Sequence, residues 1–263
     1  MADSEGSGGV GGVIVIIPTY NEYQNIEMIV GRVRESVPDA HILVADDNSP
    51  DGTGAIADTL AKDDDHVHVL HRAGKEGLGA AYIAGFRWAL ERGYDVVVEM
   101  DADGSHQPEQ LPNLLRALDS TAPAARADLV LGSRWVRGGR VRNWPLKREL
   151  LSRAANLYAR VMLGIPVRDA TGGYRAFRAA TLKRIGLDDV QSQGYCFQVD
   201  LAMRTLDDGM RVREVPITFV ERVHGASKMS KDVFREALVR VTLWGLARRG
   251  AQLAALLRGR PRR

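Results

Sequence analysis

The sequence predicts an α/β fold built on a mostly parallel, doubly wound sheet. From residue 13 to about residue 131, short runs rich in Val and Ile alternate with longer segments of helical periodicity. Such alternation is typical of parallel strands with helices on both faces of the sheet. With 263 residues and 45% hydrophobic content, the chain can bury the core that this fold requires.

Five strands and four helices are expected in the first half of the chain. The strands are expected at Val13–Ile17, His41–Ala45, Val67–Leu70, Val96–Met100 and Leu129–Leu131. The helices between them are expected at Ile26–Val37, Thr53–Lys62, Leu78–Arg92 and Pro108–Leu118. After Arg134 we expect a basic loop, a helix over Leu146–Leu163, a turn over Asp169–Tyr174 and a β segment over Val212–Val220.

The two ends of the chain differ from this main domain, which we place at residues 13–229. Residues 1–12 are rich in Gly and Ser and predict a flexible leader, since they lack the basic start and apolar core of a signal peptide. Residues 230–257 predict an amphipathic helical segment, followed by a basic tail at residues 258–263. No apolar run approaches the ~20 residues of a membrane span, so any membrane association is expected to be peripheral.

The formal charge of +3 conceals an uneven distribution. Residues 1–133 contain 9 Lys or Arg and 22 Asp or Glu, whereas residues 134–263 contain 27 and 11. An acidic half suits metals or hydroxyl-rich ligands, and a basic half suits phosphates, anionic lipid surfaces or nucleic acid; solvated faces are the simpler alternative. The single cysteine, Cys196, excludes an intramolecular disulfide and favours a reducing compartment.

Polar motifs follow three of the predicted strands. They are Pro18-Thr19-Tyr20-Asn21-Glu22, Asp46-Asp47 and Asp101-Ala102-Asp103. Ligands of open α/β sheets bind at the carboxyl ends of the strands, so these motifs should meet at one edge. The Gly-rich stretch precedes the first strand instead of following it, which argues against a dinucleotide site.

Asp101 and Asp103 are candidate metal ligands. Two carboxylates just past a strand end can converge on one hard cation, and Mg²⁺ or Mn²⁺ fits such oxygen ligands. Most Asp-x-Asp pairs are turn or cap residues, however, and this alternative stays open from the residues alone.

Four motifs, taken in order, resemble the inverting, GT-A-fold glycosyltransferases of family two. They are Pro18–Glu22, Asp46–Thr53, Asp101–Pro108 and Gly132-Ser133-Arg134. Within that family the chain is most similar to the polyprenol (dolichyl) phosphate mannose synthases, from about Val13 to Lys228. The resemblance implies a GT-A catalytic domain at residues 13–229 that moves mannose from GDP-mannose to a polyprenyl (dolichyl-type) monophosphate and leaves a β-linked product.

The resemblance also implies the residues that bind the donor. Pro18, Tyr20 and Glu22 would hold the guanosine, with Ala45 and Asp47 completing the pocket. Tyr20 offers a flat apolar surface, and the two carboxylates accept hydrogen bonds from base or ribose groups. The residues alone allow Asp47 and Asp51 also to belong to a turn that caps the next helix.

The same resemblance implies how charge is distributed around the diphosphate. Asp101 and Asp103 would contact the metal and diphosphate, and the Ala102 backbone would lie against the sugar nucleotide. Some relatives have a metal-binding Gln where this chain has Ser105, so the third ligand is open among Ser105, His106, Gln107 and water. Four cationic side chains would contact phosphate or close over the donor: Arg134, Arg148, Arg222 and Lys228.

A phosphate acceptor is largely a dianion near neutral pH, since its second pKa is ~6, and needs no protein base. It must be reached at a membrane, and residues Val233–Leu257 provide a candidate contact through Phe234, Ala237, Leu238, Val241 and Trp244, flanked by Arg235, Arg248 and Arg249. The same stripe could equally pack on the enzyme's own core. We expect a peripheral protein on the cytoplasmic face, where a separate membrane-anchoring protein is a conceivable partner.

Two other functions are compatible with parts of the sequence. The chain could use UDP-glucose, UDP-N-acetylglucosamine or another acceptor, because the motifs specify the diphosphate machinery better than the sugar. The tail Arg258–Arg263 is similar to the AT-hook core, which would suit a nucleic-acid-binding protein. One such tetrad is weak evidence, and no nucleic acid is expected as a partner.

Overall fold

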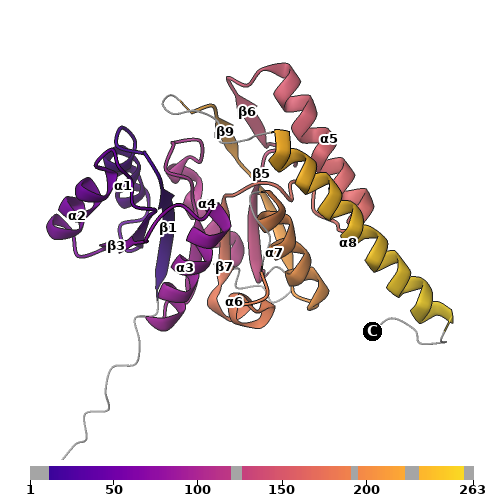
Figure 1. Ribbon diagram of the computed structural model, residues 1–263. Coiled ribbons are helices and arrows are strands. Elements are labelled where there is room, and N and C mark those ends of the chain that lie inside the picture. Colours follow the sequence, from indigo (N-terminus) through magenta and orange to yellow (C-terminus); the bar gives the residue numbers. More distant parts are fainter. Residues whose placement is uncertain (1–11, 120–125, 191–194, 223–230, 258–263) are drawn as a thin grey trace, which may run out of the picture.

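A computed structural model describes residues 12–119, 126–190, 195–222 and 231–257. Its central sheet has the strand order β3-β2-β1-β4-β7-β5-β8 (Figure 1). Neighbouring strands pair in parallel, except that β7 runs antiparallel to both β4 and β5. The predicted α/β fold with a mostly parallel sheet is therefore confirmed.

The first half of the chain follows the predicted alternation. Its elements are β1 (Val13–Thr19), α1 (Ile26–Ser36), β2 (His41–Asp46), α2 (Thr53–Asp63), β3 (Val67–His71), α3 (Leu78–Glu91), β4 (Val96–Glu99), the 3₁₀ helix η1 (Pro108–Gln110), α4 (Leu111–Leu118) and β5 (Leu129–Ser133). Every predicted boundary in this half lies within two residues of the observed one. Hydrophobic periodicity was thus a sufficient signal here.

The second half is more irregular. Its elements are β6 (Arg140–Arg142), α5 (Leu146–Leu163), β7 (Arg175–Arg178), α6 (Ala179–Ile185), α7 (Tyr195–Asp207), β8 (Val212–Pro216), β9 (Thr218–Val220) and α8 (Lys231–Leu257). Helix α5 has the predicted bounds. The single β segment predicted over Val212–Val220 was wrong, because the chain leaves the main sheet at Pro216, which has no N–H, and β9 pairs with β6 in a second sheet.

Both faces of the sheet are covered. Along β1, Ile14 and Ile16 pack into one hydrophobic cluster, and Val15 and Ile17 pack into the other. Helices α1, α2 and α4 contribute to the cluster around Val15, whereas α3, α5, α6, α7 and α8 contribute to the cluster around Ile16. Burial on both faces explains why the strands read as unbroken apolar runs.

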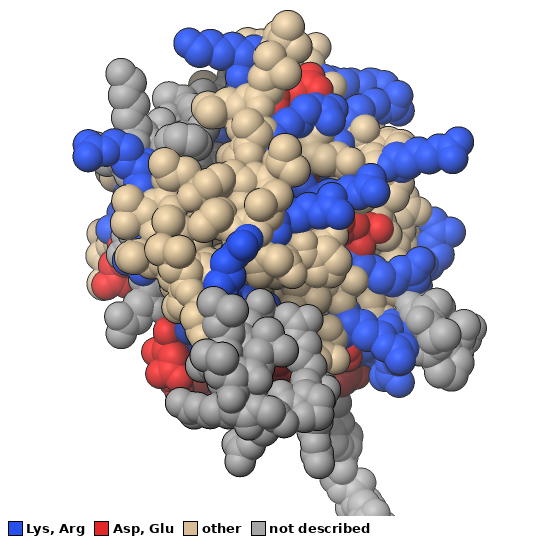
Figure 2. Space-filling model, turned by 90° about the vertical axis from the view of Figure 1, so that its right-hand side faces the viewer, with Lys and Arg blue, Asp and Glu red and all other residues tan. Residues whose placement is uncertain are grey.

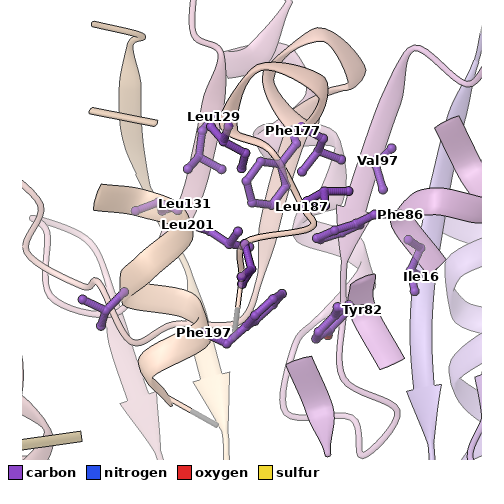
Figure 3. Packing of buried hydrophobic residues seen from close by; sticks show 14 of the residues in the cluster. Ile16, Tyr82, Phe86, Val97, Leu129, Leu131, Phe177, Leu187, Phe197 and Leu201 are labelled. Atoms are coloured by element: carbon purple, nitrogen blue, oxygen red, sulfur yellow. The ribbon is translucent and has the colours of Figure 1, made fainter. Parts of the chain in front are cut away.

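Aromatic rings hold α3 and α7 together under the centre of the sheet (Figure 3). The Tyr82 and Phe197 rings stack at 6.1 Å between centroids, and Phe86 lies edge-on to Phe177 of β7 at 5.7 Å. Gly85 permits the close approach of α3 to β1, because a Cβ at this position would lie 2.7 Å from Ile16 Cγ2. This packing holds α3 against β1 and β7, the two neighbours of β4, from which the Asp101 loop emerges.

Three histidines cluster near the amino ends of β2 and β3, away from the ends that carry the polar motifs. The rings of His41 and His68 are stacked, and His41 Nδ1 lies 2.9 Å from His68 Nε2. His66 lies beside His41, with ring centroids 4.8 Å apart. Burial lowers the pKa of both His41 and His68, and positive charge on neighbouring side chains lowers both further. The groups that set this field are Arg34, Asp64, Asp65, His66 and Arg92.

These lowered pKa values predict a loss of stability in mild acid. The unfolded chain takes up protons near the ordinary histidine pKa of 6.5, whereas folded His41 and His68 resist protonation until lower pH. The stability that neutral His41 and His68 contribute is therefore complete above pH 6.5, and it is lost as the pH falls through their folded pKa values. Urea unfolding between about pH 7.5 and 5 should show a shallower pH slope for His68→Gln than for wild type. The control His71→Gln, an exposed histidine of β3, should keep the wild-type slope; an unchanged slope in His68→Gln would contradict this account.

Candidate active site

The three predicted polar motifs meet at one edge of the sheet. Parallel register pairs Thr19 with Asp46 and sets Glu99, the last residue of β4, beside Ile16 of β1. Thr19 Oγ1 donates to Asp46 Oδ1 at 2.9 Å, and Asp46 also accepts hydrogen bonds from Ser49. Asp46 therefore links the loops after β1 and β2, and both of its carboxylate oxygens are used in these hydrogen bonds.

The loops after β1 and β2 form a shelf with two cationic neighbours that the sequence did not reveal. Lys75 Nζ lies 4.3 Å from the centre of the Tyr20 ring. Arg72 pairs with Asp47 and with Glu76, while its side chain is only 9% exposed. Burial raises the pKa of Asp47, and the Arg72 guanidinium acts in the opposite direction. Both cations follow the carboxyl end of β3, so the strand-end rule that identified the other motifs would also have found them.

Asp51, in the loop after β2, and Ala45, within β2, have mainly structural surroundings. Asp51 accepts hydrogen bonds from the Thr53 N–H and hydroxyl at 3.0 and 2.6 Å, which confirms the alternative of a turn residue at the start of α2. Ala45 is fully buried in the hydrophobic core. Its predicted place in the nucleoside pocket stays a prediction.

The acidic centre consists of Asp101 and Asp103. Asp103 Oδ1 accepts from the Ser105 N–H at 3.0 Å, and Asp103 Oδ2 lies 3.1 Å from Arg222 Nη1. Tyr82 from α3 directs its hydroxyl toward Asp101 Oδ1 at 3.5 Å. Desolvation raises the pKa of Asp101; nearby His106 opposes this rise, and Asp103 adds to it. The raised pKa of Asp101, beside a second carboxylate, makes this centre suited to a counter-cation.

The candidate third ligands differ in how free their side chains are. His106 Nδ1 accepts from the Asp101 N–H at 3.1 Å, and burial lowers its pKa. Gln107 donates to the Gly104 carbonyl and accepts from Arg32, so its amide is occupied at the far side of the loop. Ser105 Oγ, in contrast, is buried without a hydrogen-bond partner among the described residues.

These ligands fit a hard divalent cation. Within the described ranges, no three His, Cys, Asp or Glu side chains lie close enough together to hold a metal. Asp101 and Asp103 offer carboxylate oxygens and Ser105 offers a hydroxyl, and such donors suit Mg²⁺ or Mn²⁺ with further oxygen ligands from substrate or water.

A buried pair of ionisable side chains lies beside this centre. Glu99 and Arg175 are both inaccessible to solvent, with Arg175 Nε 3.9 Å from Glu99 Oε2. Burial raises the pKa of Glu99 to about 8 and lowers that of Arg175 to about 10. Arg175 donates to three backbone carbonyls, those of Ala170, Gly172 and Gln198. It thereby ties the loop before β7 to α7; nothing in the local sequence pattern indicated this role.

Two of the predicted arginines are held by acidic partners. Arg134 pairs with Asp169 through Nε at 2.8 Å and Nη2 at 2.6 Å, and Asp169 is fully buried. Asp169 also accepts from the Arg134 backbone N–H. Arg148 pairs with Glu221, and its guanidinium carbon lies over Trp144, 4.1 Å from the ring centroid. Both guanidinium groups are therefore fixed in position before any ligand binds.

One cavity of about 440 Å³ brings these groups together. Its polar end is lined by Asp101, His106, Arg134, Arg148 and Arg222. Its remaining wall is largely apolar and comes from α5, α7 and α8, with lining residues that include Leu151, Ala155, Ala159, Val199, Leu238 and Val241. A chamber with a cationic end and a hydrophobic wall suits an amphipathic, anionic ligand.

The cavity also settles which way the predicted stripe of α8 faces. Ala237, Leu238 and Val241 line the cavity, and Val241 belongs to the hydrophobic core with Trp244 packed against it. The alternative of packing on the enzyme's own core is thus confirmed for Val241, and Trp244 is partly buried against the same core. Lys228, His224 and the tail Arg258–Arg263 lie outside the described residues, as does the Phe234 side chain.

Comparison with known proteins identifies relatives over most of the chain. Residues 14–186 match the model of glycosyl transferase family 2. An undecaprenyl-phosphate mannosyltransferase of Micrococcus luteus is 59% identical over 245 residues, which cover 93% of this chain and 98% of that protein. A polyprenol monophosphomannose synthase of Mycolicibacterium smegmatis is 58% identical over 234 residues, covering 89% and 86%.

A solved structure has the same fold. Glucosyl-3-phosphoglycerate synthase of Mycobacterium tuberculosis, in complex with Mn²⁺, UDP and glucosyl-3-phosphoglycerate, superposes with a TM-score of 0.64. The match covers 92% of this chain and 81% of that one at 22% identity. At this identity the likeness shows the GT-A fold alone.

The buried Arg134–Asp169 pair predicts a large cost for removing one partner. Asp169→Asn keeps the shape but leaves a buried guanidinium without its counter-charge, so the free energy of unfolding should fall by about 3–5 kcal/mol. The control Asp188→Asn removes an exposed partner of Arg87, in a pair of the same 2.6 Å separation, and should change stability little. Urea unfolding measures both, and equal losses in the two variants would refute a special role for the buried pair.

Proposed function

Since the chain belongs to glycosyl transferase family 2, we propose that it transfers mannose from GDP-mannose to a polyprenyl monophosphate with inversion at the anomeric carbon. The relatives from Micrococcus luteus and Mycolicibacterium smegmatis, named for mannosyl transfer to such lipids, support the sugar and the acceptor class. The donor nucleotide rests on the resemblance of the motifs from Pro18 to Asp103.

The observation that carries the proposal is the cavity. Asp101 at the acidic centre and three arginines line one chamber whose other wall is apolar. A phosphate on a hydrocarbon chain fits both parts: the guanidinium groups pair with its oxygens, and the apolar wall contacts the first part of the chain. A small hydrophilic acceptor would leave that wall exposed to water.

The donor is proposed to lie on the shelf at the ends of β1 and β2. Tyr20 would contact the base, Pro18 would pack beside it, and the carboxylates of Glu22 and Asp47 would accept hydrogen bonds from the nucleoside. The half-buried position of Tyr20 and the orientation of Asp47 by Arg72 support these roles. The Ala102 backbone and Arg222 would contact the diphosphate or sugar, and Lys228 would close over the donor.

Asp101 and Asp103 are proposed to hold Mg²⁺ or Mn²⁺, with Ser105 Oγ or water as the third ligand. Two observations support this assignment: the buried Ser105 hydroxyl has no hydrogen-bond partner among the described residues, and the Ser105 N–H donates to Asp103 Oδ1. When bound, the cation supplies positive charge beside the departing diphosphate.

The chain's own residues then need only position and neutralise charge. Arg134 and Arg148, held by Asp169 and Glu221, would bind the acceptor phosphate facing the anomeric carbon. The phosphate dianion attacks without a general base, and Asp169 is in any case occupied by Arg134. Attack on the face opposite the diphosphate converts an α-linked donor into a β-linked product.

A cytoplasmic enzyme acting on the cytoplasmic face of a membrane accommodates both substrates, a soluble nucleotide sugar and a lipid. The lone Cys196 is consistent with a reducing compartment. UDP-glucose and UDP-N-acetylglucosamine are weaker candidates as donors, because the relatives that share more than half of the sequence are named for mannose. The basic tail supports no separate proposal for nucleic-acid binding.

The test is mannosyl transfer from radiolabelled GDP-mannose to a polyprenyl phosphate in the presence of Mg²⁺ or Mn²⁺. Asp103→Ala should lower the lipid-extractable label at least about a hundredfold, since it removes charge stabilisation at the leaving group. The control Asp65→Ala, which removes an exposed carboxylate outside the site, should retain full activity. EDTA should abolish the label both in wild type and in this control. Equal labelling from UDP-glucose, or full activity of Asp103→Ala, would refute the proposal.

A further inference from the structure

Thr171, in the loop before β7, lies against one of the two arginines assigned to the acceptor phosphate. It lines the cavity and is partly exposed. Its hydroxyl oxygen accepts a hydrogen bond from Arg134 Nη2 at 3.0 Å. Because a guanidinium can only donate, this contact fills one of the two lone pairs of the hydroxyl. The transfer as proposed above gives this hydroxyl no role.

Asn156 of α5 fills the second lone pair. Its side chain is buried, and Nδ2 donates both to Thr171 Oγ1 and to the Ser152 carbonyl, each at 3.0 Å. Its Oδ1 accepts from the Thr171 N–H at 3.3 Å. A carbonyl can only accept and an N–H can only donate, so the amide fits in one orientation. The atom that faces the Thr171 hydroxyl is therefore the donating nitrogen.

With both lone pairs occupied, the Thr171 hydroxyl can form a further hydrogen bond only by donating its hydrogen. Among the residues that the structure describes, the acceptor for this hydrogen is Asp169 Oδ1, at 3.5 Å. Ordinary O–H···O bonds span about 2.5–3.0 Å, so this contact is long. The same Asp169 oxygen already accepts from Arg134 Nη2 at 2.6 Å. The Thr171 hydrogen is thus available to a better acceptor in the cavity.

The surroundings of this hydroxyl favour an anion as its partner. Arg134, Arg148 and Arg222 line the same cavity as Thr171. Figure 2 shows the side of the molecule that carries α5 and α8, where Lys and Arg side chains project from a broad uncharged area. Neither these two helices nor any other helix in the described ranges is long and apolar enough to cross a bilayer. Positive charge on this side attracts phosphate groups, whose oxygens accept hydrogen bonds.

We propose that Thr171 is a substrate-binding residue, which donates its hydroxyl hydrogen to an oxygen of the acceptor phosphate beside Arg134 and Arg148. The inference rests on the proposed function, because it concerns the acceptor of that transfer. Asn156 is then a positioning residue: by filling the second lone pair, it leaves donation as the one way in which the hydroxyl binds a ligand. Such a donor suits a phosphate oxygen that carries no proton, since that oxygen can only accept.

The test measures mannosyl transfer to a short, water-soluble prenyl phosphate, with separate KM values for this acceptor and for GDP-mannose. Thr171→Val removes the hydroxyl and keeps the shape of the side chain. It should raise the acceptor KM about ten- to a hundredfold, the range for a hydrogen bond to a charged group, and leave the KM for GDP-mannose unchanged. Thr171→Ser, which keeps the hydroxyl, should recover most of this loss.

A matched control is Thr205→Val, which removes a buried hydroxyl of α7 that donates to the Leu201 carbonyl. Thr205 lies outside the cavity lining, so both KM values should stay at those of wild type. A wild-type acceptor KM in Thr171→Val, or an equal rise for both substrates, would overturn the inference. Failure of Thr171→Ser to recover acceptor binding would overturn it as well.

Asn156→Asp tests the direction of the hydrogen bond while Thr171 stays intact. The oxygen that replaces Nδ2 presents a lone pair to Thr171 in the ionised form, and also in the neutral form, whose one hydrogen the Ser152 carbonyl takes. The Thr171 hydrogen should then turn to this oxygen, and the acceptor KM should rise. Adding Asn156→Asp to Thr171→Val should raise it little further; full additivity of the two effects would contradict the assigned direction.

Calorimetric binding of the short prenyl phosphate, in the presence of GDP and Mg²⁺, separates this inference from the proposed function because it requires no transfer. Wild type should bind the phosphate, and Thr171→Val should bind it about ten- to a hundredfold more weakly. A wild type that binds the phosphate but transfers no mannose would overturn the proposed function alone. Equal binding by wild type and Thr171→Val, or no binding by wild type, would overturn the inference about Thr171.

Discussion

Parallel pairing of β1 with β2 and β4 is the constraint on which the rest of the site depends. It brings three loops that are distant in sequence to one edge, where Asp47, Asp101 and Asp103 share a small region. Tight packing behind the strands preserves this alignment, since Gly85 lets α3 contact Ile16 and the Tyr82 hydroxyl then reaches Asp101. A shift of β4 against β1 would move Asp101 and Asp103 together, away from Asp47 and the loops after β1 and β2.

The unequal charges of the two halves of the chain meet in the cavity. The acidic half provides Asp101, and the basic half provides Arg134, Arg148 and Arg222. Each of the three arginines is paired with a carboxylate: Arg222 with Asp103, Arg134 with Asp169 and Arg148 with Glu221. Phosphates and a divalent cation can therefore enter by exchanging partners within a preformed network, without bringing an uncompensated charge into a buried site.

The sequence predicted the local features well and the long-range ones poorly. Apolar periodicity predicted β1 to β5 and α5, because burial on both sheet faces leaves a strong pattern. It did not reveal β7, whose antiparallel course depends on pairing with β4 and β5, nor the pairing of Arg134 with Asp169, 35 residues away. The stripe predicted on α8 faces inward at Val241, since periodicity identifies an apolar side without showing what covers it.

The central claim is that the acceptor phosphate and the metal occupy one chamber. Phosphorus NMR of a short prenyl phosphate, with the protein, GDP and either Mn²⁺ or diamagnetic Mg²⁺, tests it most directly because a paramagnetic ion broadens only nearby signals. We predict strong broadening of the acceptor phosphate with Mn²⁺ that disappears in Arg134→Met/Arg148→Met. A sharp signal in the presence of bound Mn²⁺ and wild-type protein would contradict the claim, since the phosphate would then bind away from Asp101 and Asp103.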